Sequence, residues 1–600
     1  MGKTVKHFYE FGAFRIDLEE RLLMHEGQPV HLAPKVLDTL LLLIERRGRV
    51  VRKDEMMNLL WPDSFVEESN LTQNVFTLRK ALDEGSDNVQ YIETVPRRGY
   101  RFVANVKETQ EEIHAPEAEV TVPMMSEEEV VQVTATRRAD AITSLAVLPM
   151  ISESNDPNVE FLMDGMTESI INILSRLRRV HVVAPSLVFA FKGQKVDPQK
   201  VARALGTDAV LSGSVLVSGD ELIIKTELMD TANGWQIWGE QYFRPLADIL
   251  TLQHEVSTKI SEKLLANLSP EEEKRLGKQH TTDPEAYQSY LRGRYYWKKR
   301  TAEGYRRAIE EFEQAVKFDP TYALAHSGLA DSYIAYNFHG IVPTWETGPK
   351  AKAAVTQALA IDDTLAEAHT SLACVKMMYE RDWAGAEREF KRAIELDPTY
   401  AQAFNWYSHF LMALGRVEES FAQSQIALRL DPLDDSINQY LGWHYIHARQ
   451  FERAVSQLEK TLQLNPNFFL ARVTLGVAHS QRRDFSKAIA EFERAGEVEH
   501  PPLLSAFLGH AYAMAGRVQE ASRLLAELKE LSTRTYVPPY SIALIHTALD
   551  EKQEAFEWFD VAYETHNGWL NWIKVAPEFD SLHSDPRFTD MLLRLGLQPD

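Results

Sequence analysis

The 600-residue chain contains one cysteine, Cys374, so it forms no internal disulfide and offers no cysteine-based zinc site. Long apolar runs are also missing. The first residues lack the apolar segment of a signal peptide, and no later stretch approaches the roughly 18 consecutive apolar residues that a membrane span needs. We therefore expect a cytoplasmic protein without a membrane partner.

The charge of the chain is unevenly distributed. With 44% hydrophobic and 25% charged residues, the composition is that of a globular protein, and 600 residues exceed what one hydrophobic core holds. The net charge of −22 argues against a nucleic-acid partner, because phosphates attract cations. Residues 1–107, however, hold 16 Lys and Arg against 16 Asp and Glu, so the acidic excess lies beyond residue 107. The sequence thus predicts several domains, the first of them neutral.

Two stretches without helical or strand periodicity divide the chain. Residues 108–141 are acidic and typical of a linker, and a shorter break at 268–283 follows a periodic helix. These breaks predict an N-terminal domain at 6–107, a middle domain at 142–268, a repeat array at 282–567 and a C-terminal capping segment at 568–600.

The N-terminal block predicts a small antiparallel sheet, three helices and a hairpin. Its expected strands are Phe8 to Phe11, Phe14 to Asp17, Arg21 to Met24 and Val30 to Leu32. Its expected helices begin at Pro34 and then cover Lys53 to Leu60 and Ser69 to Leu82, each with one apolar face. The hairpin at 91–106 turns at PRRG.

The segments LAPKVLDTLLLL, NLTQNVFTLRKALDE and YIETVPRRGYRF resemble the winged helix of OmpR/PhoB-type response regulators and ToxR/CadC-like activators. The resemblance implies a bacterial transcription regulator that binds double-stranded DNA. Its recognition helix, 69–82, would enter the major groove, and its wing, 91–106, would lie on the backbone or in the minor groove. No receiver domain precedes these segments, so we expect regulation without a phosphorelay. Pro96 stands where some relatives have arginine, and the positive charge moves to Arg97 and Arg98.

The expected DNA-binding residues lie on the recognition helix and the wing: Ser69, Gln73, Asn74, Thr77, Lys80, Thr94, Arg97, Arg98, Tyr100 and Arg101. Asn and Gln can bond adenine through two hydrogen bonds, and Thr can contact a thymine methyl group. Arg79 and Lys80 have two open roles, an ion pair with Asp83 or a phosphate contact. The same polar residues would also suit a surface for protein contact.

The segment 61–66, between the second and third helices, corresponds to the loop through which relatives touch RNA polymerase. It equally fits a tight connector.

Strands and helices alternate in the middle block, which predicts an α/β domain. The segments GTDAVLSGSVLVSGDELIIKTELMDTANGWQIWGEQY and LADILTLQHEVSTKISEKL resemble the TolB N-terminal-like domain. No phosphate-binding glycine loop follows a strand, and His254 lacks the second histidine of an HExxH metal motif because position 258 is Thr. We expect no catalytic residue, cofactor or metal here, and a structural or ligand-sensing role.

The last block is repetitive. The tags FDP, IDD, LDP, LDP and LNP are spaced 43, 35, 34 and 34 residues apart, and two helices per ~34 residues is the period of tetratricopeptide repeats. Seven or eight such units fit between 284 and 567, and the resemblance implies a superhelix whose concave surface binds a protein or peptide. The segment EFDSLHSDPRFTDMLLRLGL is typical of a capping helix.

The predicted fold class is multidomain: an α+β winged helix, an α/β middle domain and an all-α solenoid. The predicted function is a non-enzymatic, sequence-specific DNA-binding regulator whose repeats sense or dock a protein partner. The alternative is a repeat scaffold that uses the winged helix for protein contact.

Overall fold

The computed structural model describes residues 4–17, 22–25, 28–30, 34–60, 68–82, 91–95, 98–104, 106–113, 142–152, 160–175, 177, 179–194, 197–218, 221–232, 234–245, 248–264 and 280–599. The chain divides into two compact units, Met1–Ser126 and Glu127–Asp600. In these ranges no helix is both long and apolar enough to cross a membrane.

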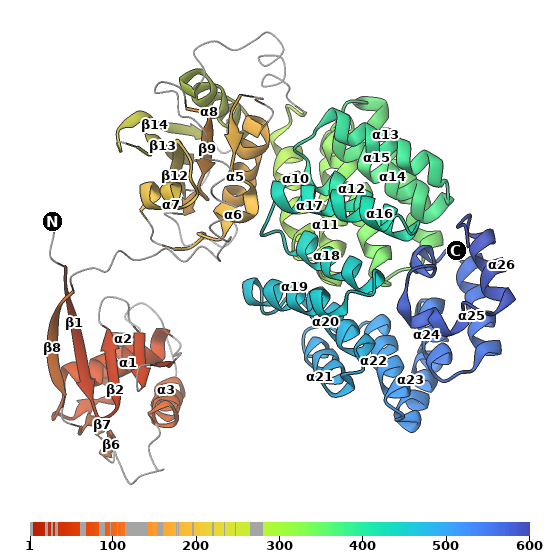
Figure 1. Cartoon of the computed structure of the whole chain (residues 1–600). Coiled ribbons are helices and arrows are strands. Elements are labelled where there is room, and N and C mark those ends of the chain that lie inside the picture. The colour runs from red at the N-terminus through yellow and green to blue at the C-terminus, as the bar shows by residue number, and fades with distance from the viewer. Residues whose placement is uncertain are drawn as a thin grey trace. The chain divides into compact units, whose positions relative to one another are not determined.

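The first unit is an α+β fold with two sheets (Figure 1). Its elements are β1 (Thr4–Phe11), β2 (Phe14–Asp17), β3 (Leu22–His25), β4 (Gln28–Val30), α1 (Pro34–Glu45), β5 (Val51–Arg52), α2 (Lys53–Leu60), α3 (Glu68–Ala81), β6 (Ile92–Val95), β7 (Gly99–Phe102) and β8 (Lys107–Ile113). The larger sheet has the order β4-β3-β2-β1-β8, and the smaller has the order β5-β7-β6. The predicted strands, helices and hairpin are all present, with small shifts at their ends.

One predicted boundary of this unit needs correction. The sequence predicts a linker from residue 108, but residues 108–113 belong to β8, which pairs with β1 so that Thr109 lies opposite Phe8. The acidic segment KETQEEI gives no apolar alternation, because the strand lies at the sheet edge and gains its stability from backbone pairing. The linker therefore begins after Ile113.

The core of the first unit lies between its helices and sheets. Four apolar residues of the third helical segment are at most 1% exposed: Leu71, Val75, Leu78 and Leu82. They share one hydrophobic cluster with Leu37 and Leu40 of α1. Because their spacing of three and four residues puts them on one face, burying that face fixes which side of α3 remains outside.

The middle of the chain is an α/β domain with a mixed sheet. Its elements are β9 (Ser144–Val147), β10 (Ile151–Ser152), α5 (Glu160–Ser175), β11 (His181–Val182), α6 (Pro185–Phe189), α7 (Pro198–Ala204), β12 (Ala209–Ser218), β13 (Glu221–Asp230), β14 (Gln236–Pro245) and α8 (Ile249–Leu264). The sheet order is β11-β9-β12-β13-β14, with parallel pairing of the first three strands and antiparallel pairing of the last three. The predicted α/β class is confirmed.

The repeats form eight helix pairs. They are α10 (Pro284–Trp297) with α11 (Ala302–Phe318), α12 (Ala323–Phe338) with α13 (Thr344–Ile361), α14 (Ala366–Val375) and η4 (Lys376–Glu380) with α15 (Trp383–Leu396), α16 (Ala401–Ala413) with α17 (Val417–Leu430), α18 (Asp435–His447) with α19 (Phe451–Leu464), α20 (Phe469–Gln481) with α21 (Phe485–Gly496), α22 (Pro502–Met514) with α23 (Val518–Leu531), and α24 (Pro539–Ala548) with α25 (Lys552–Glu564). The first helix of each pair packs on the first helices of adjacent pairs, so most of α12 and α18 is buried. The second helices bury one stripe each. This confirms the predicted solenoid.

The middle domain and the array are one compact unit rather than the two separate blocks that the break at 268–283 predicted. Helix α10 joins them. Its Tyr287 is 3% exposed, and the Tyr287 hydroxyl donates to Ser169 Oγ of α5 at 3.2 Å. Leu291 packs against Gly165 of α5, where an added Cβ would meet Leu291 Cδ2 at 2.7 Å. The first repeat helix therefore belongs to both hydrophobic cores.

The array closes on itself through its C-terminal end. The Arg381 guanidinium donates to the Tyr563 carbonyl at 2.9 Å, and Trp383 Nε1 donates to the Leu595 carbonyl at 2.8 Å. These contacts join the third repeat to the last one, and Figure 1 shows the blue C-terminal helices beside the green helices of the first repeats. The repeats thus form a ring.

The segment 568–600 is more than the predicted cap. Only α26 (Pro586–Arg594) packs on α25 as a cap. Before it, η5 (Gly568–Trp572) and η6 (Pro577–Leu582) run along the inner helices of the ring. Trp569 Nε1 donates to the Phe338 carbonyl at 2.8 Å, and Trp572 Nε1 donates to the His409 carbonyl at 3.2 Å. Part of the concave face is therefore covered by this chain's own residues.

Candidate nucleic-acid interface

Helix α3 buries its apolar face in the core, so its polar face lies outside the core. Asn74 and Thr77 lie on it and are partly buried. Asn74 Nδ2 donates to Thr39 Oγ1 of α1 at 3.1 Å. Because Thr39 is completely buried, this bond holds the Asn74 side chain against α1, and a base contact through Asn74 has to compete with it.

The wing is the β6–β7 hairpin, and β5 pairs with its second strand. At Gly99, φ is +156° and an added Cβ would lie 1.9 Å from the Val51 carbonyl oxygen. Only glycine lets β7 approach β5 this closely. The position of the wing therefore depends on Gly99.

Arg79 ties α3 to the wing. One of its guanidinium nitrogens, Nη2, donates to the Ile92 carbonyl and to Thr94 Oγ1, both at 2.8 Å. The sequence allows Arg79 either an ion pair with Asp83, which lies outside the described residues, or a contact with a DNA phosphate. Its observed partners are 13 and 15 residues away, beyond the reach of helix spacing rules, so no sequence signal identified them. Helix α3 and the wing consequently form one edge of the domain.

The wing residues differ in what their side chains do. Thr94 and Arg98 are exposed. Tyr100 is 4% exposed and packs in the core, so its ring holds the wing to the helices. Arg101 lies opposite Glu93 across the hairpin, and its Nε donates to Glu93 Oε2 at 2.8 Å. This ion pair offsets the positive charge that the sequence placed there for phosphate contact.

Several predicted contact residues cannot be placed. The side chains of Ser69, Gln73, Lys80 and Arg97 and the whole segment 61–66 lie outside the described residues. Their roles toward DNA and RNA polymerase stay predictions. Over the described ranges, no three His, Cys, Asp or Glu side chains are grouped to hold a metal.

Comparison with known proteins assigns two parts of the chain. Residues 27–102 match the family described as "Transcriptional regulatory protein, C terminal". Residues 378–435 and 441–502 match a tetratricopeptide-repeat family. The chain combines an OmpR/PhoB-type winged-helix domain with tetratricopeptide repeats.

Three relatives show how far the similarity extends. The chain is 36% identical over 187 residues to Putative adenylate cyclase 3 of Rhizobium meliloti, which covers 31% of this chain and 32% of that protein. It is 23% identical over 431 residues to Transcriptional regulator HilA of Salmonella typhimurium, 71% of this chain and 70% of HilA. The Escherichia coli Transcriptional activator CadC is 34% identical over 85 residues, 14% of this chain and 17% of CadC. The chain thus spans only about a third of the cyclase relative's length. The resemblance of the middle domain to the TolB N-terminal-like domain stays a prediction.

Proposed function

We propose that this protein is a non-enzymatic, sequence-specific DNA-binding transcription regulator. Helix α3 would enter the major groove, and the wing would lie on the backbone or in the minor groove. The observation that carries the proposal is the tie through Arg79, which fixes α3 and the wing as one edge. The names of HilA and CadC, both transcription regulators, support the same function.

Base reading falls to Asn74 and Thr77 in this proposal, and backbone contact falls to Thr94 and the wing arginines. Arg98 is exposed on the turn, whereas the charge of Arg101 is offset by Glu93. Because the first 107 residues carry equal numbers of acidic and basic residues, few phosphate contacts are expected. Each such contact steepens the fall of log affinity with log salt by about 0.9. We expect a shallow but measurable salt dependence.

The experiment is a binding titration of the full chain on duplex DNA at several salt concentrations. Thr77→Ala should cost ~1–3 kcal/mol on the preferred sequence and little on others. The matched control is Thr356→Ala, which removes an exposed threonine side chain from α13 of the array and leaves the first unit unchanged. Affinity that is equal for all duplexes and independent of salt would refute the proposal.

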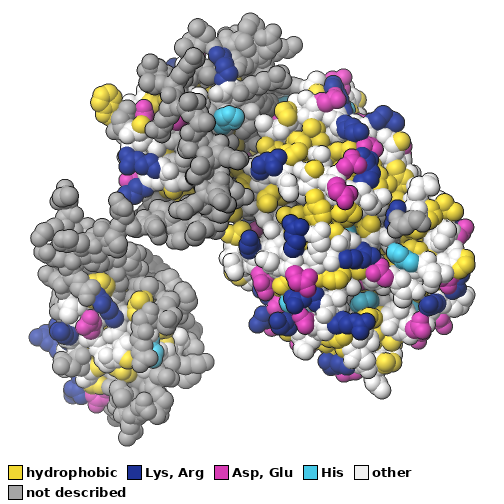
Figure 2. Space-filling model, viewed as in Figure 1, with side chains coloured by type: hydrophobic (Ala, Val, Ile, Leu, Met, Phe, Trp, Pro, Cys, Tyr) yellow, Lys and Arg dark blue, Asp and Glu magenta, His cyan; other side chains and the backbone are white. Residues whose placement is uncertain are grey.

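The repeats would dock a protein partner and bring regulation to the promoter. Figure 2 shows acidic and basic side chains interspersed on the visible face of the array, which fits a partner of mixed charge. Deleting the repeats should change promoter output in cells and leave the DNA sequence preference unchanged. RNA polymerase contact through 61–66 belongs to the same proposal.

A scaffold role is the second candidate, and the Arg101–Glu93 pair favours it because it neutralises a wing cation. The titration separates the two, since a scaffold predicts no preferred sequence.

A further inference from the structure

A cavity of about 460 Å³ lies inside the ring of repeats. Its walls come from segments far apart in the sequence: 300–305, 338–341, 439–443, 469–474, 499–507, 531–536 and Trp569 of the C-terminal segment. The cavity is therefore formed where the first two repeats meet the fifth to seventh repeats and the C-terminal segment. The volume is in the range of small-molecule sites, which run from about 300 to 1,000 Å³.

Aromatic rings form much of the wall. Phe338 and Trp569 stack with centroids 5.3 Å apart and planes 9° from parallel. Trp443 meets Trp569 edge-on at 5.9 Å, and Phe507 meets it at 6.2 Å and 70°. Such a wall suits a flat aromatic ligand, because edge-to-face and offset stacking add to the burial of apolar area.

One buried polar atom in the wall has no partner. Gln439 is 6% exposed, and its Oε1 accepts no hydrogen bond from any described residue. Its amide orientation is fixed by neighbours. Thr474 Oγ1 donates to the Leu470 carbonyl at 2.7 Å, so it can only accept from Gln439 Nε2, which lies 2.8 Å away. A buried, unpaired acceptor costs ~1–3 kcal/mol, which a ligand N–H would recover.

Both signs of charge occur at one part of the cavity wall. The Arg300 guanidinium lies over the Trp297 ring, 4.5 Å from its centroid, and no carboxylate of the described residues lies within ion-pair distance of it. Glu499 accepts from the Ala302 amide at 3.2 Å, which brings this carboxylate to the segment that begins at Arg300. A ligand with a carboxylate and an ammonium group would meet both.

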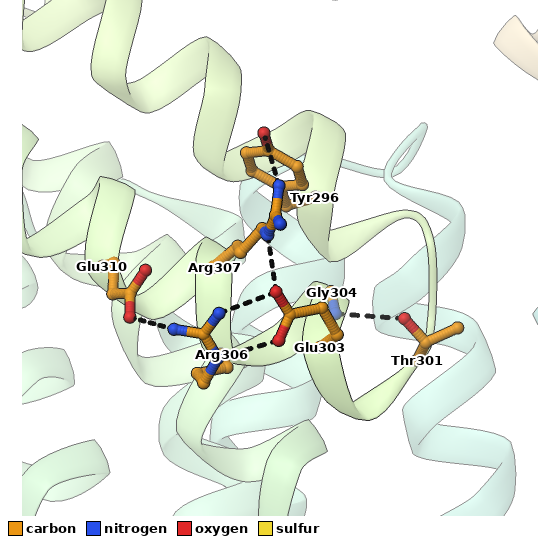
Figure 3. Close-up of polar contacts among 7 residues, drawn as sticks. All are labelled: Tyr296, Thr301, Glu303, Gly304, Arg306, Arg307 and Glu310. Atoms are coloured by element: carbon orange, nitrogen blue, oxygen red, sulfur yellow. Dashed lines mark hydrogen bonds and ion pairs between the residues drawn. The ribbon is translucent and has the colours of Figure 1, made fainter. Parts of the chain in front are cut away.

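A third charge in the wall is already neutralised. Figure 3 shows the Glu303 carboxylate accepting from Arg306 and Arg307, and these bonds lower its pKa to about 2. Thr301 caps the same helix by accepting from the Gly304 amide at 3.0 Å. Glu303 therefore stays ionised with its own partners, which leaves Arg300 and Glu499 to contact a ligand.

We propose that this cavity binds an aromatic amino acid or a close derivative that has an N–H on its ring. The ligand ring packs on the wall that Trp443, Phe507 and Trp569 form, and its N–H donates to Gln439 Oε1. The carboxylate pairs with Arg300, and the ammonium group faces Glu499. Because five of the eight repeats and the C-terminal segment line the site, an occupied cavity stabilises the closed ring.

The test is isothermal titration calorimetry of the full chain with L-tryptophan, indole-3-acetate, tryptamine and indole. We expect one site per chain, with tryptophan bound most tightly. Gln439→Met should weaken all four probes by about tenfold or more, because all four carry the ring N–H. Arg300→Gln should weaken only tryptophan and indole-3-acetate, by a similar factor.

The control is Arg483→Gln. Arg483 also has a positive φ, +63°, in the turn after the first helix of its repeat, but it does not line the cavity. Arg483→Gln should leave the affinity for each of the four probes unchanged. Leu470→Trp, which adds volume to the cavity wall, should abolish binding even if Gln439→Met fails to fold. No heat from any probe at millimolar concentration, or binding that the cavity variants leave unchanged, would overturn the proposal.

Discussion

Replacing Trp572 should loosen the C-terminal segment from the inside of the ring. Trp572 is 2% exposed, lies 4.4 Å from the His409 ring centroid and meets Phe338 edge-on at 5.6 Å. Its Nε1 also donates to the His409 carbonyl. Truncating a buried tryptophan to alanine costs ~3–5 kcal/mol, of which the lost hydrogen bond is ~1 kcal/mol.

Hydrogen exchange of the full chain, followed by mass spectrometry, measures this cost segment by segment. In Trp572→Ala, amides of 568–582 should exchange about a hundredfold faster or more, since each 1.4 kcal/mol is a factor of ten. Trp345→Ala is the control, because Trp345 is 69% exposed on α13 and its loss should change exchange little. If Trp572→Ala accelerates exchange less than threefold, the segment does not hold the ring closed.

Three further predictions concern the wing and a buried histidine. Gly99→Ala should force the wing off β5, which faster hydrogen exchange at 91–102 would report. It should also weaken binding to all DNA sequences. Unchanged exchange would contradict the close approach of β7 to β5. Arg79→Ala should reduce sequence discrimination, whereas Arg98→Ala should only flatten the salt slope by about one; equal effects of the two would contradict the tie. Burial lowers the pKa of His444 from 6.5 to about 3, so below pH 6.5 the unfolded chain gains a proton that the folded chain excludes, and stability falls as pH falls toward 3. Between pH 7 and 5 this effect lowers the free energy of unfolding by about 2 kcal/mol. In urea unfolding, the free energy of unfolding of His444→Gln should therefore fall by about 2 kcal/mol less over this pH range. An unaltered pH dependence would contradict the neutral, buried state of His444.

The sequence predicts elements better than it predicts their partners. Apolar spacing located α1 and α3 because a helix that buries one face repeats every three to four residues. β8 was missed because its side chains carry no alternation and only its backbone pairs with β1. The ring closure was missed because Arg381 and Tyr563 meet across 182 residues, and no local pattern encodes such a contact.

For the DNA interface too, the sequence predicts the elements but not the role of each side chain. The recognition helix and the wing follow from spacing and turn residues, whereas the role of each side chain depends on its neighbours in space. Arg101 was expected to contact phosphate and is paired with Glu93, and Tyr100 is buried in the core. Arg79, with two described partners on the wing, is the positioning residue that helix spacing did not identify.

Selection of DNA duplexes from a random pool by the full chain measures whether α3 and the wing recognise a DNA sequence. We expect an enriched sequence motif, affinity that falls with added salt, and a broader motif for Thr77→Ala but not for Thr356→Ala. A pool that stays random, with binding unaffected by salt, would contradict DNA recognition by α3 and the wing.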